Sequence, residues 1–189
     1  MSKPMGDKHY TYADYVTWTG DERWELIDGV PYMMSSPHSN HQRIVTRLAG
    51  RLDATVQEKC EAFASPMDLT FDVSQETDRV VQPDVFVMCG EYEAGPRVVG
   101  VPVLVIEVLS PSTFKRDKMI KFNLYQNVGV KEYWVVDIEH RGIDVFVLED
   151  GRYQHKGVYN NDDILKCASL PEFQISVTEI FERVNHDQV

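Results

Sequence analysis

An acidic residue at the centre of the most apolar stretch of the chain constrains the fold more than any other feature. Residues 101–109 read Val-Pro-Val-Leu-Val-Ile-Glu-Val-Leu, and a Ser-Pro-Ser-Thr segment follows at 110–113. In an extended strand, apolar side chains would project from both faces, which is typical of a strand buried on both sides. A carboxylate is strongly disfavoured there unless a cation, a metal ion or several hydrogen-bond donors meet it. We therefore expect Glu107 to have a defined partner.

Composition limits the class of protein. The 189 residues suffice for one domain with a sizeable core. A net charge of −11 argues against a protein that coats nucleic acid non-specifically, although metal ions and a local basic groove can override it. Cys60, Cys89 and Cys167 follow no ligand spacing and predict reduced, buried thiols. Without a signal segment or a membrane-spanning stretch, the sequence predicts a cytoplasmic protein that does not bind membranes.

Hydrophobic periodicity, capping residues and two Asp-Gly turns predict the secondary structure. Helices are expected at residues 11–18, about 40–59, about 113–128 and 176–184. Strands are expected at residues 24–27 and 30–34 as a hairpin, at 61–65, 67–72, 80–88, 101–109 and 132–137, and at 143–148 and 152–158 as a second hairpin. This order predicts an α/β sandwich around a mixed sheet.

Three features point to one chemistry. The first is Glu107, and the second is Asp84, which follows a proline at the head of an apolar run. The third is Lys121, which shares a sector with the apolar face of the helix expected after residue 113 and therefore needs a negative partner. Two carboxylates and a lysine near one sheet end suit Mg²⁺, which takes one or two carboxylates and leaves positions for water and phosphate. The metal would polarise the phosphate and activate a water, and the lysine could orient or deprotonate the nucleophile.

Five short segments spread over most of the chain carry a family resemblance. They are residues 24–29 (Trp-Glu-Leu-Ile-Asp-Gly), Ser36-Pro37 with His41, residues 82–84 (Gln-Pro-Asp), residues 107–113 (Glu-Val-Leu-Ser-Pro-Ser-Thr) and residues 129–137 (Gly-Val-Lys-Glu-Tyr-Trp-Val-Val-Asp). Together they resemble the Uma-type putative restriction endonuclease family of the PD-(D/E)XK nuclease superfamily. The last two segments are the most distinctive.

This resemblance implies a restriction-endonuclease-like core, a central mixed β-sheet flanked by helices, with an added N-terminal helix and hairpin and a C-terminal hairpin. It also implies an endonuclease that hydrolyses DNA with Mg²⁺ or Mn²⁺, bound by Asp84, Glu107 and the carbonyl of Val108. The superfamily places a lysine two residues after the glutamate, where this chain has Leu109, and the resemblance transfers that role to Lys121. We also expect one domain over residues 1–189, with disordered tails at 1–8 and 185–189. By analogy with the superfamily, we expect a homodimer.

Each candidate residue also has a structural interpretation. Glu107 could form a buried ion pair with Lys121 or an arginine without a metal, and Asp84 could cap backbone amides at a strand start. Lys121 could pair with Asp117 four residues earlier. Glu25 could be an acid that faces the metal or supports its ligands, or a cross-strand partner.

Other candidates involve histidine and the basic residues. His41 could tune the site, contact phosphate or only stabilise a helix start. Phosphate contacts are expected from Lys115, Arg116 and Lys118, close to Lys121 in sequence. A stripe of arginines at 43, 47 and 51 could follow a phosphate backbone, although such a stripe is more often a solvated helix face. Leu109 and the acidic charge also allow a catalytically inactive nuclease-fold module that binds nucleic acid or a protein.

Overall fold

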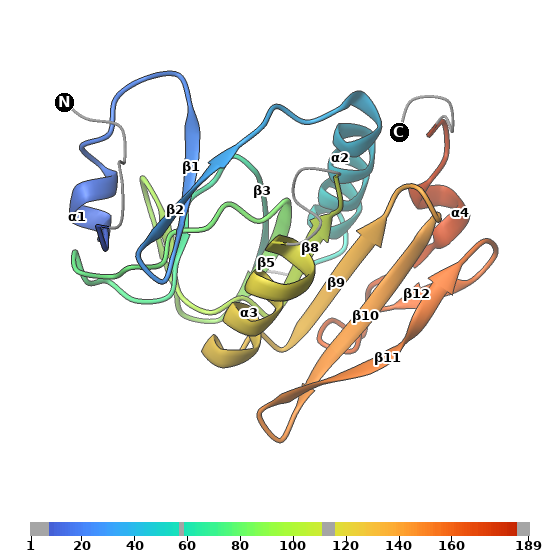
Figure 1. Cartoon of the computed structure of the whole chain (residues 1–189). Helices are drawn as coiled ribbons and strands as arrows, with labels where there is room; N and C mark the ends of the chain where they lie inside the picture. The colour runs from blue at the N-terminus through green and yellow to red at the C-terminus, as the bar shows by residue number, and fades with distance from the viewer. Residues whose placement is uncertain (1–7, 57–58, 111–115, 185–189) are drawn as a thin grey trace.

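A six-stranded mixed sheet forms the centre of the computed structural model, which describes residues 8–56, 59–110 and 116–184, with the side chains of 116–118 left aside (Figure 1). The strand order is β11-β10-β9-β8-β5-β3, and only the pair β8–β9 is parallel. The bounds are β3 (Cys60–Ala64), β5 (Val85–Cys89), β8 (Leu104–Val108), β9 (Glu132–Asp137), β10 (Gly142–Glu149) and β11 (Arg152–Asn160).

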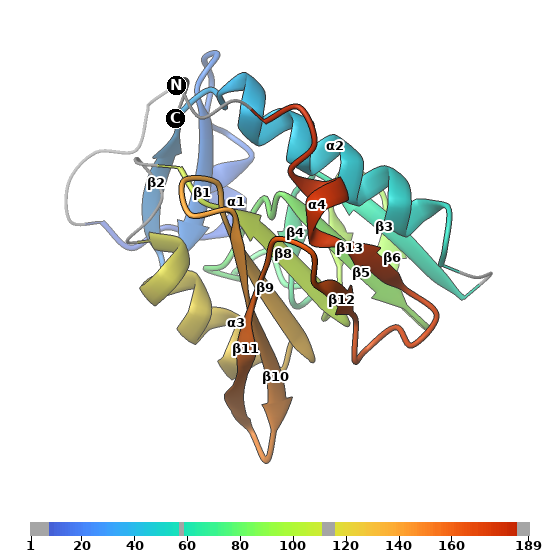
Figure 2. The same ribbon diagram turned by 90° about the vertical axis from the view of Figure 1, so that its right-hand side faces the viewer.

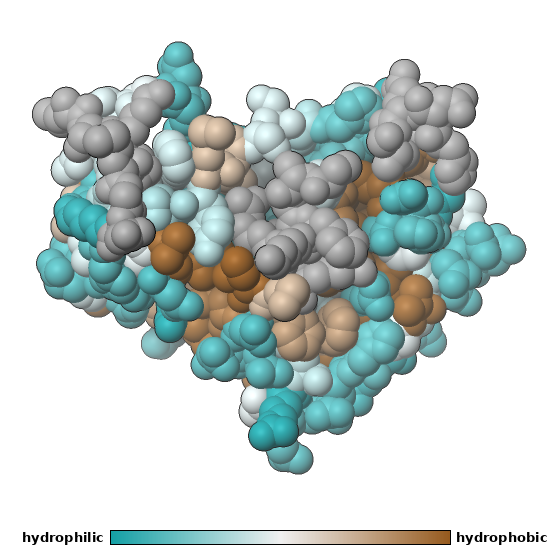
Figure 3. Space-filling view, viewed as in Figure 1, coloured by the Kyte–Doolittle hydropathy of each residue, from teal (hydrophilic) through white to brown (hydrophobic). Residues whose placement is uncertain are grey.

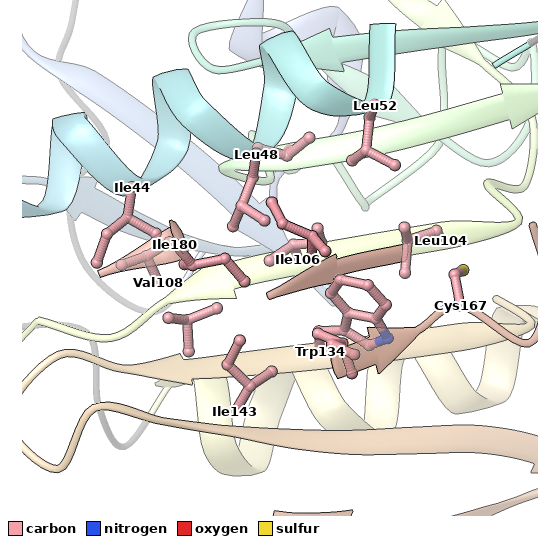
Figure 4. Close-up of a cluster of buried hydrophobic side chains, with 14 of the residues drawn as sticks. Ile44, Leu48, Leu52, Leu104, Ile106, Val108, Trp134, Ile143, Cys167 and Ile180 are labelled. Carbon is pink, nitrogen blue, oxygen red and sulfur yellow. The ribbon is translucent and has the colours of Figure 1, made fainter. Parts of the chain in front are cut away.

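Helices cover both faces of this sheet. The long helix α2 (Ser39–Asp53) and the short α4 (Val177–Ile180) lie on one face, and α3 (Phe122–Val128) lies on the other (Figures 1 and 2). A π-helical segment, η1 (Arg116–Lys121), leads directly into α3. The apolar stripe of α2 packs on strand β8, as Figure 4 shows for Ile44, Leu48, Leu52, Leu104, Ile106 and Val108.

Strand β8 alternates between the two layers of core, as the sequence predicted. Ile106 and Val108 belong to the core on the α2 side, whereas Val105 and Leu109 belong to the core on the α3 side. Glu107 therefore points to the α3 side, and only 2% of its surface is exposed.

Smaller elements surround the central sheet. An N-terminal helix α1 (Tyr12–Tyr15) precedes the hairpin of β1 (Arg23–Ile27) and β2 (Val30–Met34), whose Asp28-Gly29 turn has positive φ at both residues. The remaining strands form two small sheets: β4 (Leu69–Thr70) with β7 (Val98–Val99) and β6 (Glu93–Ala94), and β12 (Ile164–Lys166) with β13 (Gln174–Ser176). Strand β4 lies within the strand expected at 67–72, whereas the sequence did not predict the other four.

The predicted element boundaries needed correction in several places. Strand β5 begins at Val85 rather than at residue 80, because Pro83 has no N–H to donate to a ladder. Val80 and Val81 instead form isolated bridges to the hairpin and to β4. The helices expected at 11–18, 40–59 and 176–184 are shorter, and the helix expected from 113 is described from Arg116. Residues 1–7 and 185–189 of the predicted tails lie outside the description, whereas Lys8 forms an ion pair with Asp14.

The prediction of reduced cysteines was wrong for two of the three. Cys60 and Cys89 face each other in the register of β3 and β5 with Cα atoms 4.1 Å apart, and they form a disulfide. Cys167 is a free, buried thiol whose pKa is raised by burial and by the nearby Glu132 carboxylate. The cysteines therefore no longer support a reducing compartment. Within the described residues, no helix combines the length and apolar character needed to cross a membrane.

A second buried acid, Glu132, has no exposed surface and lies at the start of β9. Its Oε1 accepts a hydrogen bond from the indole of Trp134 at 2.7 Å, and its Oε2 accepts from the Cys167 thiol and from the backbone N–H of Ser169. Three donors from two distant segments thus meet one carboxylate and tie the C-terminal segment to the sheet.

Removing this acceptor should destabilise the fold. We expect Glu132→Ala to lower the free energy of unfolding by about 3 kcal/mol or more, because several donors lose a partner away from water. Urea denaturation followed by circular dichroism measures the change. The matched control is Glu172→Ala at an exposed position, for which we expect a change within about 0.5 kcal/mol. Equal stability of the two variants would contradict this account of Glu132.

Candidate active site

A buried lysine stands between two buried glutamates on the α3 side of the sheet. Lys121, at the end of η1, is 1% exposed, and its Nζ lies 2.8 Å from Oε1 of Glu107 and 2.9 Å from Oε1 of Glu25. Glu25 comes from the middle of β1 and is completely buried. These contacts identify the partner that the apolar setting of Glu107 requires. Lys121 thus lies within hydrogen-bond distance of Glu107, whereas position 109 holds a leucine.

A tyrosine one helical turn after the lysine also forms a hydrogen bond with Glu107. The hydroxyl of Tyr125 donates to Oε1 of Glu107 at 2.7 Å, the same oxygen that accepts from Lys121. Burial, and then the charges of Glu107 and Glu25, raise the pKa of Tyr125 well above its ordinary value. The hydroxyl therefore remains a protonated donor over the working pH range.

Asp84 lies at the same end of the sheet as Glu107. Asp84 immediately precedes β5, whose first residue Val85 pairs with Ile106, the neighbour of Glu107 in β8. The Oδ2 atom of Asp84 accepts the backbone N–H of Val108 at 2.7 Å and lies 3.1 Å from Nε2 of His41 on α2. Asp84 thus caps an amide, as its structural interpretation expected, and also contacts a histidine.

A hydrogen-bond network of polar residues holds Glu25 in position. The backbone N–H of Gln82 donates to Oε1 of Glu25 at 2.9 Å, and its side-chain Nε2 donates to Oδ1 of Asp68 at 2.8 Å. The hydroxyl of Tyr15 donates to the same Asp68 oxygen and connects α1 to the network. Burial raises the pKa of Asp68, since its carboxylate is largely removed from water. The N-terminal helix is therefore linked to the site through three hydrogen bonds.

Sequence reasoning missed Gln82, Asp68, Tyr15 and Tyr125. Tyr125 could have been found, because it follows Lys121 by four residues on the same helix face. Gln82 belonged to the Gln-Pro-Asp segment, but no sequence pattern indicated that it binds Glu25 and Asp68. Asp68 and Tyr15 reach the site only through tertiary packing.

The structure describes the side chains of only some of the basic residues that were expected to contact phosphate. Lys115 lies outside the described residues, and Arg116, Lys118 and Asp117 lie in η1 with side chains that are not described. Arg43 donates to Asn40, Arg47 donates to the carbonyl of Ile180, and Arg51 pairs with Glu179. The last two arginines therefore contact α4 and its end, so the stripe is not simply a solvated helix face.

The donor set fits a divalent cation that completes its shell with water and substrate. Asp84 and Glu107 supply two carboxylates at one strand edge, and the carbonyl of Val108 follows Glu107 directly. Among the described residues, no group of three or more His, Cys, Asp or Glu side chains could hold a metal ion, so a bound ion would depend on two carboxylates, a carbonyl and water. In Figure 3, hydrophilic residues surround a patch of apolar residues on the face that Figure 1 shows.

The buried ion triplet should contribute strongly to stability. We expect Lys121→Met to lower the free energy of unfolding by about 3–5 kcal/mol at neutral pH, because two buried carboxylates lose their common cation. Denaturant unfolding measures this, with the exposed Lys166→Met as the control. The loss should shrink when Glu107→Gln is combined with Lys121→Met, since the two residues are coupled. A decrease in the free energy of unfolding of less than about 1 kcal/mol for Lys121→Met would contradict the assignment of Lys121 as the cation shared by the two glutamates.

Comparison with known proteins places this fold in a family. The chain is 32% identical to the uncharacterized Synechocystis protein slr1290 over 72% of this chain and 73% of that protein. It is 30% identical to the uncharacterized Synechocystis protein sll1609 over 61% of this chain and 67% of that protein. The crystal structure of a putative nuclease belonging to DUF820 from Anabaena variabilis superposes with a TM-score of 0.75 at 18% identity, covering 93% of this chain and 99% of that chain.

The fold of that neighbour confirms the predicted restriction-endonuclease-like core with its central mixed sheet. The family description, putative restriction endonuclease, matches residues 12–178, which include Glu25, Asp84, Glu107 and Lys121. Families of this type generally use divalent metals and act on nucleic acids. The chain therefore belongs to the Uma2 family of putative restriction endonucleases.

Proposed function

We propose that this protein is a divalent-metal-dependent endonuclease that hydrolyses phosphodiester bonds in DNA. Family membership supports a nuclease, and one observation carries the finer proposal. Glu25, Asp84 and Glu107 bring three carboxylates to one end of the sheet, where Lys121 supplies one ammonium. Carboxylates gathered in a place that is almost removed from water are stabilised by bound cations. A bound dication would add such stabilisation next to Lys121.

The ligands in the proposal are Asp84, Glu107 and the carbonyl of Val108. Within the described residues, both hydrogen bonds to Asp84 fall on Oδ2, which leaves Oδ1 for a metal ion. Bound Mg²⁺ or Mn²⁺ would polarise the scissile phosphate and make a bound water more acidic. Both ions prefer oxygen ligands, so either ion fits these donors.

The chain's own residues hold this arrangement. Two carboxylates beside Lys121 favour its charged form, so the ammonium is suited to orient the nucleophile and stabilise charge on the phosphate. His41 fixes one oxygen of Asp84, and Tyr125 fixes one oxygen of Glu107. Glu25 offsets the lysine charge and sets its position. The proposed homodimer follows from family analogy alone.

A second candidate is a nuclease-fold module that binds nucleic acid without cleaving it. Lys121 already neutralises part of the charge of Glu25 and Glu107, and the superfamily lysine position holds Leu109. Such a module would bind DNA equally well with and without a divalent metal. Metal-dependent cleavage separates the two candidates.

The test is cleavage of supercoiled plasmid DNA with Mg²⁺ or Mn²⁺. We expect the parent to nick the plasmid, and we expect Glu107→Ala and Asp84→Asn each to lower the rate by about two orders of magnitude. Isothermal titration calorimetry should show weaker Mn²⁺ binding by the same variants. Glu172→Ala should behave as the parent in both assays.

Two outcomes would change the proposal. Equal cleavage by the parent and Glu107→Ala would remove Glu107 from the mechanism. Duplex binding by a parent that cleaves nothing with either metal would favour the non-catalytic module.

A further inference from the structure

An open groove of about 650 Å³ runs along the outer face of α2 and is lined by Ser39, Gln42, Arg43, Thr46 and Arg47. Figure 2 shows α2 at the surface of the molecule with α4 packed against it. The lining side chains carry hydroxyl, amide and guanidinium donors, and none of these described lining residues is acidic. A donor-rich, acid-free surface is unusual in a chain with a net charge of −11.

The two arginines of the groove are held in place without being neutralised. Nη1 of Arg43 donates to Oδ1 of Asn40 at 2.9 Å, and Nη1 of Arg47 donates to the carbonyl of Ile180 at 2.6 Å. In the part of the chain that the structure describes, neither guanidinium forms an ion pair, whereas Arg51 pairs with Glu179. A guanidinium fixed by one hydrogen bond keeps four further donors and loses less side-chain entropy on binding an anion.

The groove also lies next to the proposed site. His41, which contacts Asp84, lies on the same helix between Ser39 and Arg43. Residues 39–47 extend over only about 12 Å of helix at 1.5 Å per residue. The exposed groove residues and the buried histidine that contacts Asp84 therefore lie close together along one helix.

From these contacts we infer that the groove binds the sugar-phosphate backbone of DNA, with Arg43 and Arg47 each neutralising a phosphate beside the one that is cleaved. This inference rests on the proposed function. Local positive charge is the feature that lets an acidic protein approach a nucleic acid. The groove reads no sequence, because phosphate contacts set position rather than specificity.

Binding of a labelled duplex, measured by fluorescence anisotropy in EDTA over a series of salt concentrations, tests the inference without cleavage. Each lost phosphate contact should reduce the slope of log K against log salt by about 0.9. We expect Arg43→Ala to reduce the slope by about 0.9 and Arg43→Ala with Arg47→Ala by about 1.8. Arg43→Lys should keep the parent slope, since lysine also neutralises a phosphate.

Arg51→Ala is the matched control, because Arg51 lies on the same helix and pairs with Glu179. Arg43 is exposed, so Arg43→Ala decides the test even if loss of Arg47 affects folding. An unchanged slope for Arg43→Ala, with a parent that binds and cleaves DNA, would overturn the inference and leave the proposed function intact. A parent that neither binds nor cleaves duplex DNA would overturn both.

Discussion

The rest of the site depends on one buried ammonium group shared by two carboxylates. Glu25 and Glu107 lie 2.9 and 2.8 Å from the nitrogen of Lys121 and stabilise its charge away from water. The three residues come from β1, β8 and η1, so the ion triplet fixes the hairpin and the helix against the central sheet. A pair of carboxylates without the lysine would repel each other, and a lysine without them would be an unpaired buried charge.

Much of this core could be predicted from sequence, because its signals are local. The apolar stretch around Glu107 gave the buried strand and the need for a partner, and helical spacing set Lys121 on an apolar face. Both predictions use only the periodicities of strands and helices. Glu25 could not be assigned, because its neighbours in β1 fit a cross-strand partner as well. Its contact with Lys121 joins residues almost a hundred positions apart, which no periodic pattern reveals.

Register and tertiary packing account for most of what the sequence did not predict. Cys60 and Cys89 bond because β3 and β5 align them, and a spacing of 29 residues carries no such information. The two-residue strands β6 and β7 exist only where neighbouring segments meet them. Gln82 fell inside the strand expected at 80–88, yet it precedes β5, and its backbone and side chain bind Glu25 and Asp68.

Placing the lysine on a helix rather than on the strand of Glu107 changes what controls the proposed site. A lysine at position 109 would keep its place through the backbone of β8, but Leu109 packs there in the α3-side core. Lys121 keeps its place only while η1 and α3 remain seated, and Leu124 and Tyr125 of α3 are buried in that same core. The packing of α3 and the geometry of the ion triplet are therefore coupled. A change that loosens α3 must also move the ammonium away from Glu107, even when no charged residue is altered.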